Sequence, residues 1–74
     1  MTVTVKLIGP LVYAAGFSEK ALTFPGPVTA GELLSRVSLA ALPTIVTRNG
    51  NAVAPRDPLA EGDRVVISPI YSGG

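Results

Sequence analysis

Apolar and polar side chains alternate from the first residues of the chain onward. Val3, Val5 and Leu7 fall on one side of an extended backbone, and threonine and lysine side chains fall on the other. A period of two residues predicts a half-buried strand over residues 2–8. A Gly-Pro pair ends this strand, and residues 10–18 are expected to form a loop that is unusually apolar.

The middle of the chain predicts a short strand followed by the main helix. The strand is expected over residues 19–24, with Ala21 and one of its apolar neighbours against the core. Thr29 and Glu32 have the spacing of a capping box, in which each side chain accepts a hydrogen bond from the backbone amide of the other residue. Apolar residues follow at helical spacing, so we expect one main helix from about Ala30 to Leu39.

The second half of the chain begins with a predicted hairpin. Residues 44–48 are rich in β-branched side chains and predict a strand. Asn49-Gly50 favours a type I′ turn, because both residues tolerate positive φ, and residues 51–54 return as a short strand. Asp57 followed by proline indicates a single helical turn over residues 57–60.

The last predicted strand covers residues 64–70, with Val65 and Ile67 facing the core. The predicted order is therefore strand, strand, helix, strand, strand, strand. An initial hairpin, a helix across one face and later strands together predict a two-layer α+β domain. If the first and last strands pair in the centre of the sheet they are parallel, and the helix supplies part of the crossover between them.

Composition limits this domain to a modest core and a surface with little charge. The chain has 74 residues, of which 47% are hydrophobic and only 15% are charged. The typical charged share of a soluble domain is about 25%. Such a surface exposes apolar area, which is either a partner site or simply a surface with few charges.

The residue types that are missing exclude several functions. The chain has no Cys and no His, so it lacks a thiol nucleophile, a cysteine zinc site and the usual general base near neutral pH. Its 6 basic residues are scattered and its net charge is only +1, which argues against nucleic-acid binding. Glu61 and Asp63 lack a third ligand, so we interpret them as part of a turn around Gly62 rather than as a metal site.

The sequence shows neither a secretory leader nor a membrane span. Its first residues lack the basic and long apolar regions of a signal peptide. No apolar run approaches the roughly 18 residues that a membrane span requires. We therefore expect a cytoplasmic protein without a membrane partner.

The predicted order of elements resembles the β-grasp, or ubiquitin-like, fold, which is a mixed sheet with one main helix packed on one face. The closing segment resembles the end of the MoaD/ThiS family of sulfur carriers. The residues that carry this resemblance are Asn49-Gly50, Val53, Pro55, Pro58-Leu59, Gly62-Asp63-Arg64-Val65, Ile67, Pro69 and Gly73-Gly74. The resemblance implies a β-grasp domain over residues 1–70 and a flexible C-terminal tail, ending in Gly-Gly, over residues 71–74.

The resemblance also implies a defined chemistry at Gly74. An E1-like adenylating enzyme uses ATP to form an acyl-adenylate on the Gly74 carboxylate, and sulfur from a persulfide or similar donor then replaces AMP to leave a thiocarboxylate. The chain would thus be a carrier and co-substrate rather than an enzyme, with no cofactor or metal of its own. The thiocarboxylate would donate its sulfur to a synthase subunit that is MoaE-like or thiazole synthase-like.

Two groups of residues would support this chemistry. Gly73, Ser72 and Tyr71 would thread the carboxylate into a narrow channel of the partner, and Gly73 keeps the tail thin because glycine lacks Cβ. The outward side of the last strand is the candidate partner surface, formed by Arg64, Val66, Ser68 and Ile70. Ordinary sheet packing and a solvated charge are the alternative interpretations of that surface.

The sequence leaves the pathway open. The apolar segment Leu11–Gly16 resembles MoaD, the small subunit of molybdopterin synthase, and favours molybdopterin (molybdenum cofactor) biosynthesis. The short connection from Val37 to Pro43 instead resembles ThiS, so a thiamine-pathway or tRNA-thiolation carrier is the alternative. A ubiquitin-like modifier conjugated through Gly74 and a β-grasp RNA-binding module are further classes, and the missing basic patch argues against the second.

Overall fold

A computed structural model describes residues 1–70 of the chain. These residues form five strands and two helices. In chain order the elements are β1 (Thr2–Leu7), α1 (Leu11–Ala15), β2 (Glu19–Thr23), α2 (Ala30–Arg36), β3 (Thr44–Arg48), β4 (Asn51–Val53) and β5 (Arg64–Pro69).

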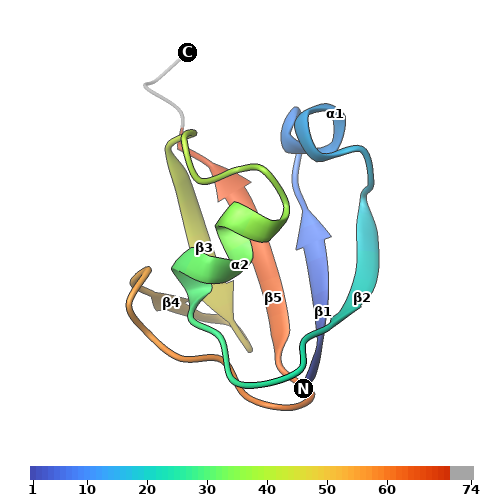
Figure 1. Cartoon of the computed structure of the whole chain (residues 1–74). Helices are drawn as coiled ribbons and strands as arrows, with labels where there is room; N and C mark the ends of the chain where they lie inside the picture. The colour runs from blue at the N-terminus through green and yellow to red at the C-terminus, as the bar shows by residue number, and fades with distance from the viewer. Residues whose placement is uncertain (71–74) are drawn as a thin grey trace.

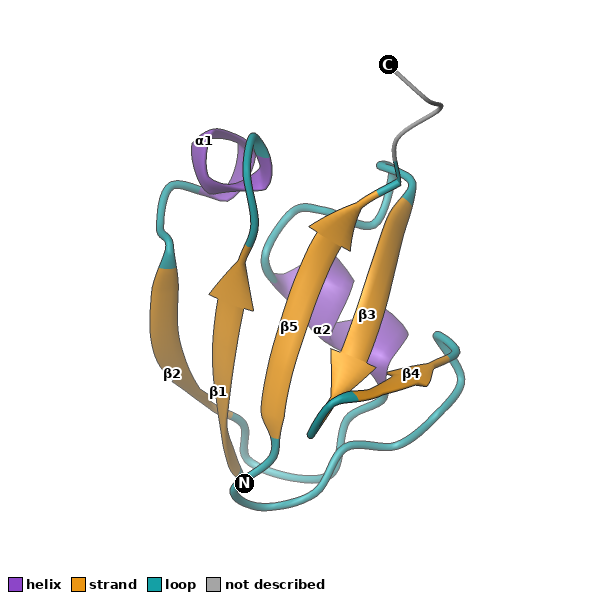
Figure 2. Ribbon diagram, turned by 180° about the vertical axis from the view of Figure 1, so that it is seen from behind, coloured by secondary structure: helices purple, strands orange, loops and turns teal. Residues whose placement is uncertain are grey.

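The five strands form one mixed sheet in the order β2-β1-β5-β3-β4. The central strands β1 and β5 are parallel, and the other neighbouring pairs are antiparallel. Helix α2 lies across one face of the sheet, and Figure 2 shows the opposite face in front with α2 behind it. The structure confirms the predicted α+β arrangement, including the parallel pairing of the first and last strands (Figure 1).

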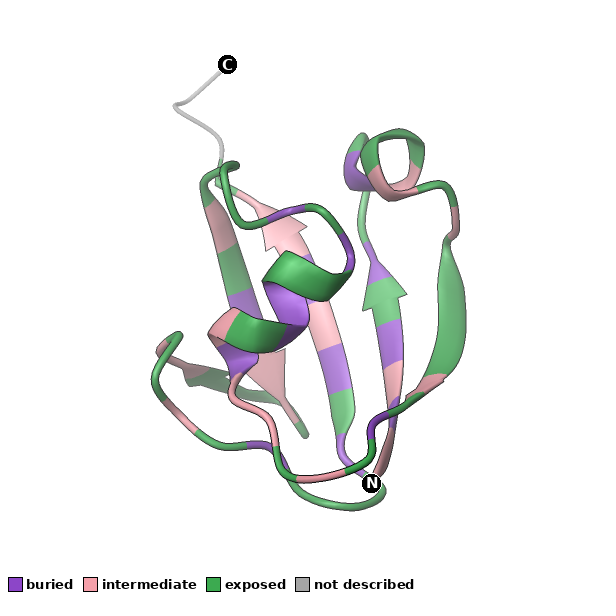
Figure 3. Cartoon of the chain, viewed as in Figure 1, coloured by how far each residue is buried: buried purple, intermediate pink, exposed green. Residues whose placement is uncertain are grey.

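The core lies between α2 and the sheet face that α2 covers (Figure 3). Val65 and Ile67 of β5 have no exposed surface, as their alternation in the sequence predicts. Leu33 of α2 is likewise fully buried. Because successive residues of a strand point to opposite faces, Val66, which lies between Val65 and Ile67, must belong to the open face of the sheet.

Helix α2 begins with the predicted capping box. The Thr29 hydroxyl accepts from the Glu32 amide at 3.2 Å, and Glu32 Oε1 accepts from the Thr29 amide at 3.0 Å. The helix ends at Arg36, three residues before the predicted end at Leu39. Ser38 adopts a left-handed conformation with φ of 65°, and the amide of Leu39 closes the helix end by donating to the carbonyl of Leu34.

The predicted loop over residues 10–18 is wrong, because the structure has a short helix there, α1. Pro10 precedes it with φ of −65°, and Gly16 ends it with φ of 88°. Leu11, the first residue of the helix, is buried in the core. The apolar character of this segment therefore belongs to a helix that closes one end of the core.

The predicted helical turn over residues 57–60 is also wrong. This stretch is extended and runs beside the chain before α2, where the Leu59 amide donates to the Val28 carbonyl at 2.9 Å. The Ala30 amide donates to the Asp57 carbonyl, also at 2.9 Å. The Asp57 carboxylate accepts from the Ala54 amide, so it stabilises a turn rather than a helix start.

The prediction that Ala21 faces the core is wrong as well. The register of β1 and β2 places Ala21 opposite Thr4 and Leu22 opposite Val3. Because Val3 is a core residue, Leu22 faces the core side and Ala21 is exposed on the open face. The hairpin turn at Asn49-Gly50 is confirmed, since both residues have positive φ.

Asp63 is a buried carboxylate that holds two turns together. Its Oδ2 accepts from the Ala60 amide at 2.7 Å, and its Oδ1 accepts from Asn49 Nδ2 at 3.0 Å. The interpretation of Asp63 as a turn residue is therefore confirmed. Arg48 Nε also lies 4.0 Å from the carboxylate.

Replacing Asp63 by alanine is expected to lower the free energy of unfolding by about 2–4 kcal/mol, because two donors lose a buried, charged acceptor. Chemical denaturation would measure the change. Glu19→Ala is a matched control, since Glu19 is exposed on an edge strand, and it should change stability by less than about 0.5 kcal/mol. Equal effects of the two substitutions would contradict the role assigned to Asp63.

Candidate functional site

The candidate site lies where the chain leaves the end of β5, the middle strand of the sheet. Ile70 follows this strand, and its amide donates to the carbonyl of Pro43 at 3.3 Å. This hydrogen bond fixes the point from which the last residues start. The predicted tail residues Tyr71, Ser72, Gly73 and Gly74 lie outside the described residues.

Three of the predicted partner-surface residues form a row on the open face of the sheet. Arg64, Val66 and Ser68 alternate along β5 with the buried residues, so they share the face opposite α2 (Figure 2). Arg64 is exposed, whereas Val66 and Ser68 are half-buried between neighbouring strands. The row leads along β5 towards the end at which the tail starts.

The neighbours of this row make its centre apolar and its sides polar. Val66 lies opposite Lys6 of β1 and Thr47 of β3. The backbone of Arg64 is fixed by Asn49. The Asn49 side-chain oxygen accepts from the Arg64 backbone amide at 2.9 Å, and the Asn49 backbone amide donates to the Arg64 carbonyl at 2.8 Å. The row is therefore held rigidly in the sheet.

Ile45 belongs to the same face, although the sequence did not single it out. It lies opposite Ser68 and is 47% exposed. Thr44, Val46 and Thr47 around it in β3 are all β-branched, so no alternation of side-chain type indicates which face Ile45 occupies. Only the register between β3 and β5 places this isoleucine beside the predicted partner surface.

The fourth predicted residue, Ile70, lies on a different surface. It is 52% exposed and lines an apolar hollow of about 270 Å³ together with Leu11 and Ala14 of α1 and Leu42. Pro10, Pro43 and Pro69 complete the rim of this hollow. The tail therefore starts at the edge of an apolar depression that was not predicted from the sequence.

The described part of the chain contains neither a cluster of metal-ligating side chains nor a membrane-spanning helix. Within residues 1–70, no three acidic, cysteine or histidine side chains converge in a way that could hold a metal ion. Neither α1 nor α2 is long and apolar enough to cross a bilayer. The described residues place the open-face row and the start of the tail on the same central strand, β5.

Comparisons with known proteins identify one matching family model and several solved structures with the same fold. The model of the ThiS family matches residues 5–74. Three solved chains share the fold along their whole length. They are the modifier protein SAMP1 from Haloferax volcanii (26% identity, TM-score 0.81), ThiS from Geobacter metallireducens (25%, 0.66) and one chain in a complex of subunits 1 and 2 of molybdopterin-converting factor from Helicobacter pylori (20%, 0.66). Each alignment covers 100% of both chains. No curated protein sequence matches this chain.

Proposed function

We propose that this chain, which belongs to the ThiS family, is a sulfur carrier whose Gly74 carboxylate is adenylated and then converted to a thiocarboxylate. The observation that carries the proposal is the family match, which extends over residues 5–74 and so includes the terminal Gly-Gly pair. The chain itself supplies the carboxylate, the tail and the docking surface. The partner enzyme supplies the adenylation site and uses ATP there.

The geometry of the described residues supports a chain that delivers its terminal carboxylate to a partner enzyme. The tail starts at Ile70, which is tied to Pro43 at the end of the central strand. Four residues follow Ile70, and when extended they reach about 13 Å. That length is enough for the carboxylate to enter a partner while the open face of β5 remains in contact with the partner surface.

Two partners act in turn in this proposal. An E1-like adenylating enzyme first joins the Gly74 carboxylate to the AMP part of ATP and releases pyrophosphate. A persulfide or similar donor then displaces AMP; with a persulfide, a thiol cleaves the resulting acyl disulfide, is itself oxidised to a disulfide, and leaves the thiocarboxylate on Gly74. A synthase-type subunit afterwards accepts the sulfur. Arg64, Val66 and Ser68, with Ile45 beside them, are proposed as the surface on which these partners dock, and Gly73, Ser72 and Tyr71 as the segment that threads into them.

We propose molybdopterin biosynthesis as the pathway, with thiamine synthesis and tRNA thiolation as the alternatives. The support is the apolar segment that resembles MoaD, which the structure shows as helix α1. In this pathway the acceptor would be a MoaE-like large subunit. Transfer assays with each candidate acceptor subunit would separate the three pathways.

Intact-mass analysis tests the carrier function directly. Incubation with the activating enzyme, ATP and a sulfur donor is expected to raise the mass by the difference between one sulfur and one oxygen atom. Fragmentation should place the sulfur on Gly74, and omission of ATP is the control. A mass that stays unchanged under conditions that charge a known carrier would overturn the proposal.

Conjugation to other proteins is the second candidate function. It is favoured by the similarity to SAMP1, a modifier protein that the chain matches over its full length. The two functions share the adenylation step and differ in the final bond. Recovery of Gly74 only in isopeptide linkage to lysines of other proteins would replace the carrier function by the modifier function.

A further inference from the structure

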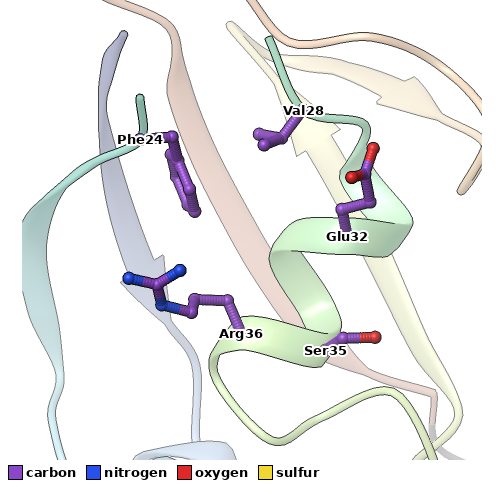
Figure 4. Close-up of a pocket in the computed structure, with 5 residues that line it drawn as sticks. All are labelled: Phe24, Val28, Glu32, Ser35 and Arg36. Carbon is purple, nitrogen blue, oxygen red and sulfur yellow. The ribbon is translucent and has the colours of Figure 1, made fainter. Parts of the chain in front are cut away.

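A groove runs between the edge strand β2 and helix α2. It consists of two adjoining hollows that share Arg36. The larger, of about 400 Å³, lies against Phe24 and Val28, and the smaller, of about 180 Å³, lies against Lys20 and Leu22. Figure 4 shows the larger hollow, with Phe24 and Arg36 pointing towards each other from opposite sides. We call these two hollows the β2–α2 groove.

The strand that borders this groove has an unused edge. Within residues 1–70, no other strand pairs with the outer side of β2. The Leu7 amide donates to the Ser18 carbonyl, and the Phe24 amide donates to the Met1 carbonyl. Because antiparallel strands alternate the direction of their backbone groups, the intervening odd-numbered residues direct their N–H and C=O groups outward. These residues are Glu19, Ala21 and Thr23.

Charge is distributed unevenly along the groove. Lys20 Nζ lies 4.8 Å from the centre of the Phe17 ring, and the Arg36 guanidinium lies 5.5 Å from the centre of the Phe24 ring. The carboxylate of Glu32, at the other end, is occupied in the capping box of α2. Both cations, Lys20 and Arg36, therefore line the smaller hollow, whereas the larger hollow adds the apolar side chains of Phe24 and Val28 beside Arg36.

A lysine on an edge strand usually discourages pairing with another chain. Here the register places Lys20 on the helix side of β2, opposite Val5, so a strand added at this edge would have to carry a group that pairs with the ammonium charge. The Lys20 ammonium group folds over Phe17 rather than extending along the open edge. The edge and the groove beside it are thus available to the same ligand.

We infer that the β2–α2 groove binds an extended peptide that adds to β2 as a further strand. Backbone groups of the peptide pair with Glu19, Ala21 and Thr23, and alternate side chains enter the groove. Charge complementarity sets the order of these side chains: apolar ones at Phe24 and a carboxylate between Lys20 and Arg36. In the sheet, β1 separates β2 from β5, so this site is distinct from the tail and goes beyond the proposed carrier function.

Two synthetic peptides test the inference, because the direction of the added strand is open. The probes are fluorescently labelled acetyl-Thr-Val-Thr-Ile-Thr-Asp-Thr-amide and its reversed sequence. We expect saturable binding of at least one peptide with a Kd below about 1 mM, seen by fluorescence anisotropy. Amide NMR signals of residues 19–23 should shift on binding. The same peptide with Asn in place of Asp should bind about tenfold more weakly.

Variants of the full chain then separate the contribution of the groove's charge from that of backbone pairing along β2. Arg36→Gln should weaken binding about tenfold, whereas Arg56→Gln, a matched exposed control outside the groove, should stay within about twofold. Ala21→Pro removes one outward N–H without touching the pairs to β1, and it should abolish binding; circular dichroism verifies its fold. Deleting Gly74 should leave peptide binding unchanged, so this result does not depend on the carrier function. If neither peptide saturates, or if the folded Ala21→Pro variant or the Arg36→Gln variant binds as wild type, the inference is wrong.

Discussion

Deleting Gly74 is expected to abolish carrier activity while leaving the free energy of unfolding within about 0.5 kcal/mol of wild type. The fold is insensitive because the buried residues of β5 end at Ile67, well before the tail. The chemistry is sensitive because the new terminal carboxylate is drawn back by about 3.5 Å. A misplacement of even about 1 Å can reduce a reaction rate about a hundredfold.

Mass spectrometry of thiocarboxylate formation measures the loss of carrier activity, and urea denaturation measures the free energy of unfolding. Adding one alanine after Gly74 should have the same effect, because it displaces the carboxylate in the other direction. Wild-type levels of thiocarboxylate, or full support of the pathway in cells, from the deletion variant would refute the sulfur-carrier proposal. Loss of activity together with loss of folding would instead show that the tail contributes to the core.

Gly73→Val tests whether the tail must pass through a narrow channel of the activating enzyme. A β-branched side chain widens the tail and restricts its backbone, so adenylation should fall while the domain stays folded. Gly26→Val is the matched control, because a Cβ at Gly26 would meet no atom within 4 Å. Equal activities of the two variants would exclude a narrow channel around Gly73.

Local patterns in the sequence predicted the structure correctly where residues close together in the chain determine it. The alternation in β1 and β5 predicted the buried sides of both strands, because a residue in a strand must face one side or the other. Thr29 and Glu32 predicted the start of α2, since their hydrogen bonds depend on residues only three positions apart. Asn49-Gly50 predicted its turn for the same reason.

The predictions failed where contacts distant in sequence decide the structure. Helix α1 has five residues and too few turns to show a helical period, and it is stabilised by the burial of Leu11. Residues 57–60 are extended because their backbone pairs with the segment before α2, more than twenty-five positions earlier. A cap-like Asp-Pro pair carries no information about that pairing.

The candidate site was predictable in part for the same reason. Val66 and Ser68 follow from the alternation of β5, which is a local pattern. Ile45 follows from the register of β3 on β5, which the sequence does not display. The β2–α2 groove was not predictable from local patterns. Arg36 and Lys20 belong to different elements, and only the packing of α2 beside β2 brings them to one groove.

Val66→Glu is expected to weaken binding to the activating enzyme at least about thirtyfold, because a charge then enters the apolar centre of the proposed docking surface. The substitution should not destabilise the fold of the free protein. Val66 lies directly opposite Lys6 on the open face, so the new carboxylate can pair with the Lys6 ammonium group. The free energy of unfolding should therefore change by less than about 1 kcal/mol. Titration calorimetry with the activating enzyme measures the loss.

The neighbouring residue shows why this effect would report docking rather than folding. Ile67 is fully buried one position further along β5, and Ile67→Ala should cost about 2–5 kcal/mol of stability. Ala21→Glu places the same charge on the same open face but at the edge strand, two strands from β5, and it should bind the enzyme normally. If Val66→Glu also binds normally while its stability is unchanged, the open-face row packs the sheet and the enzyme docks on another surface.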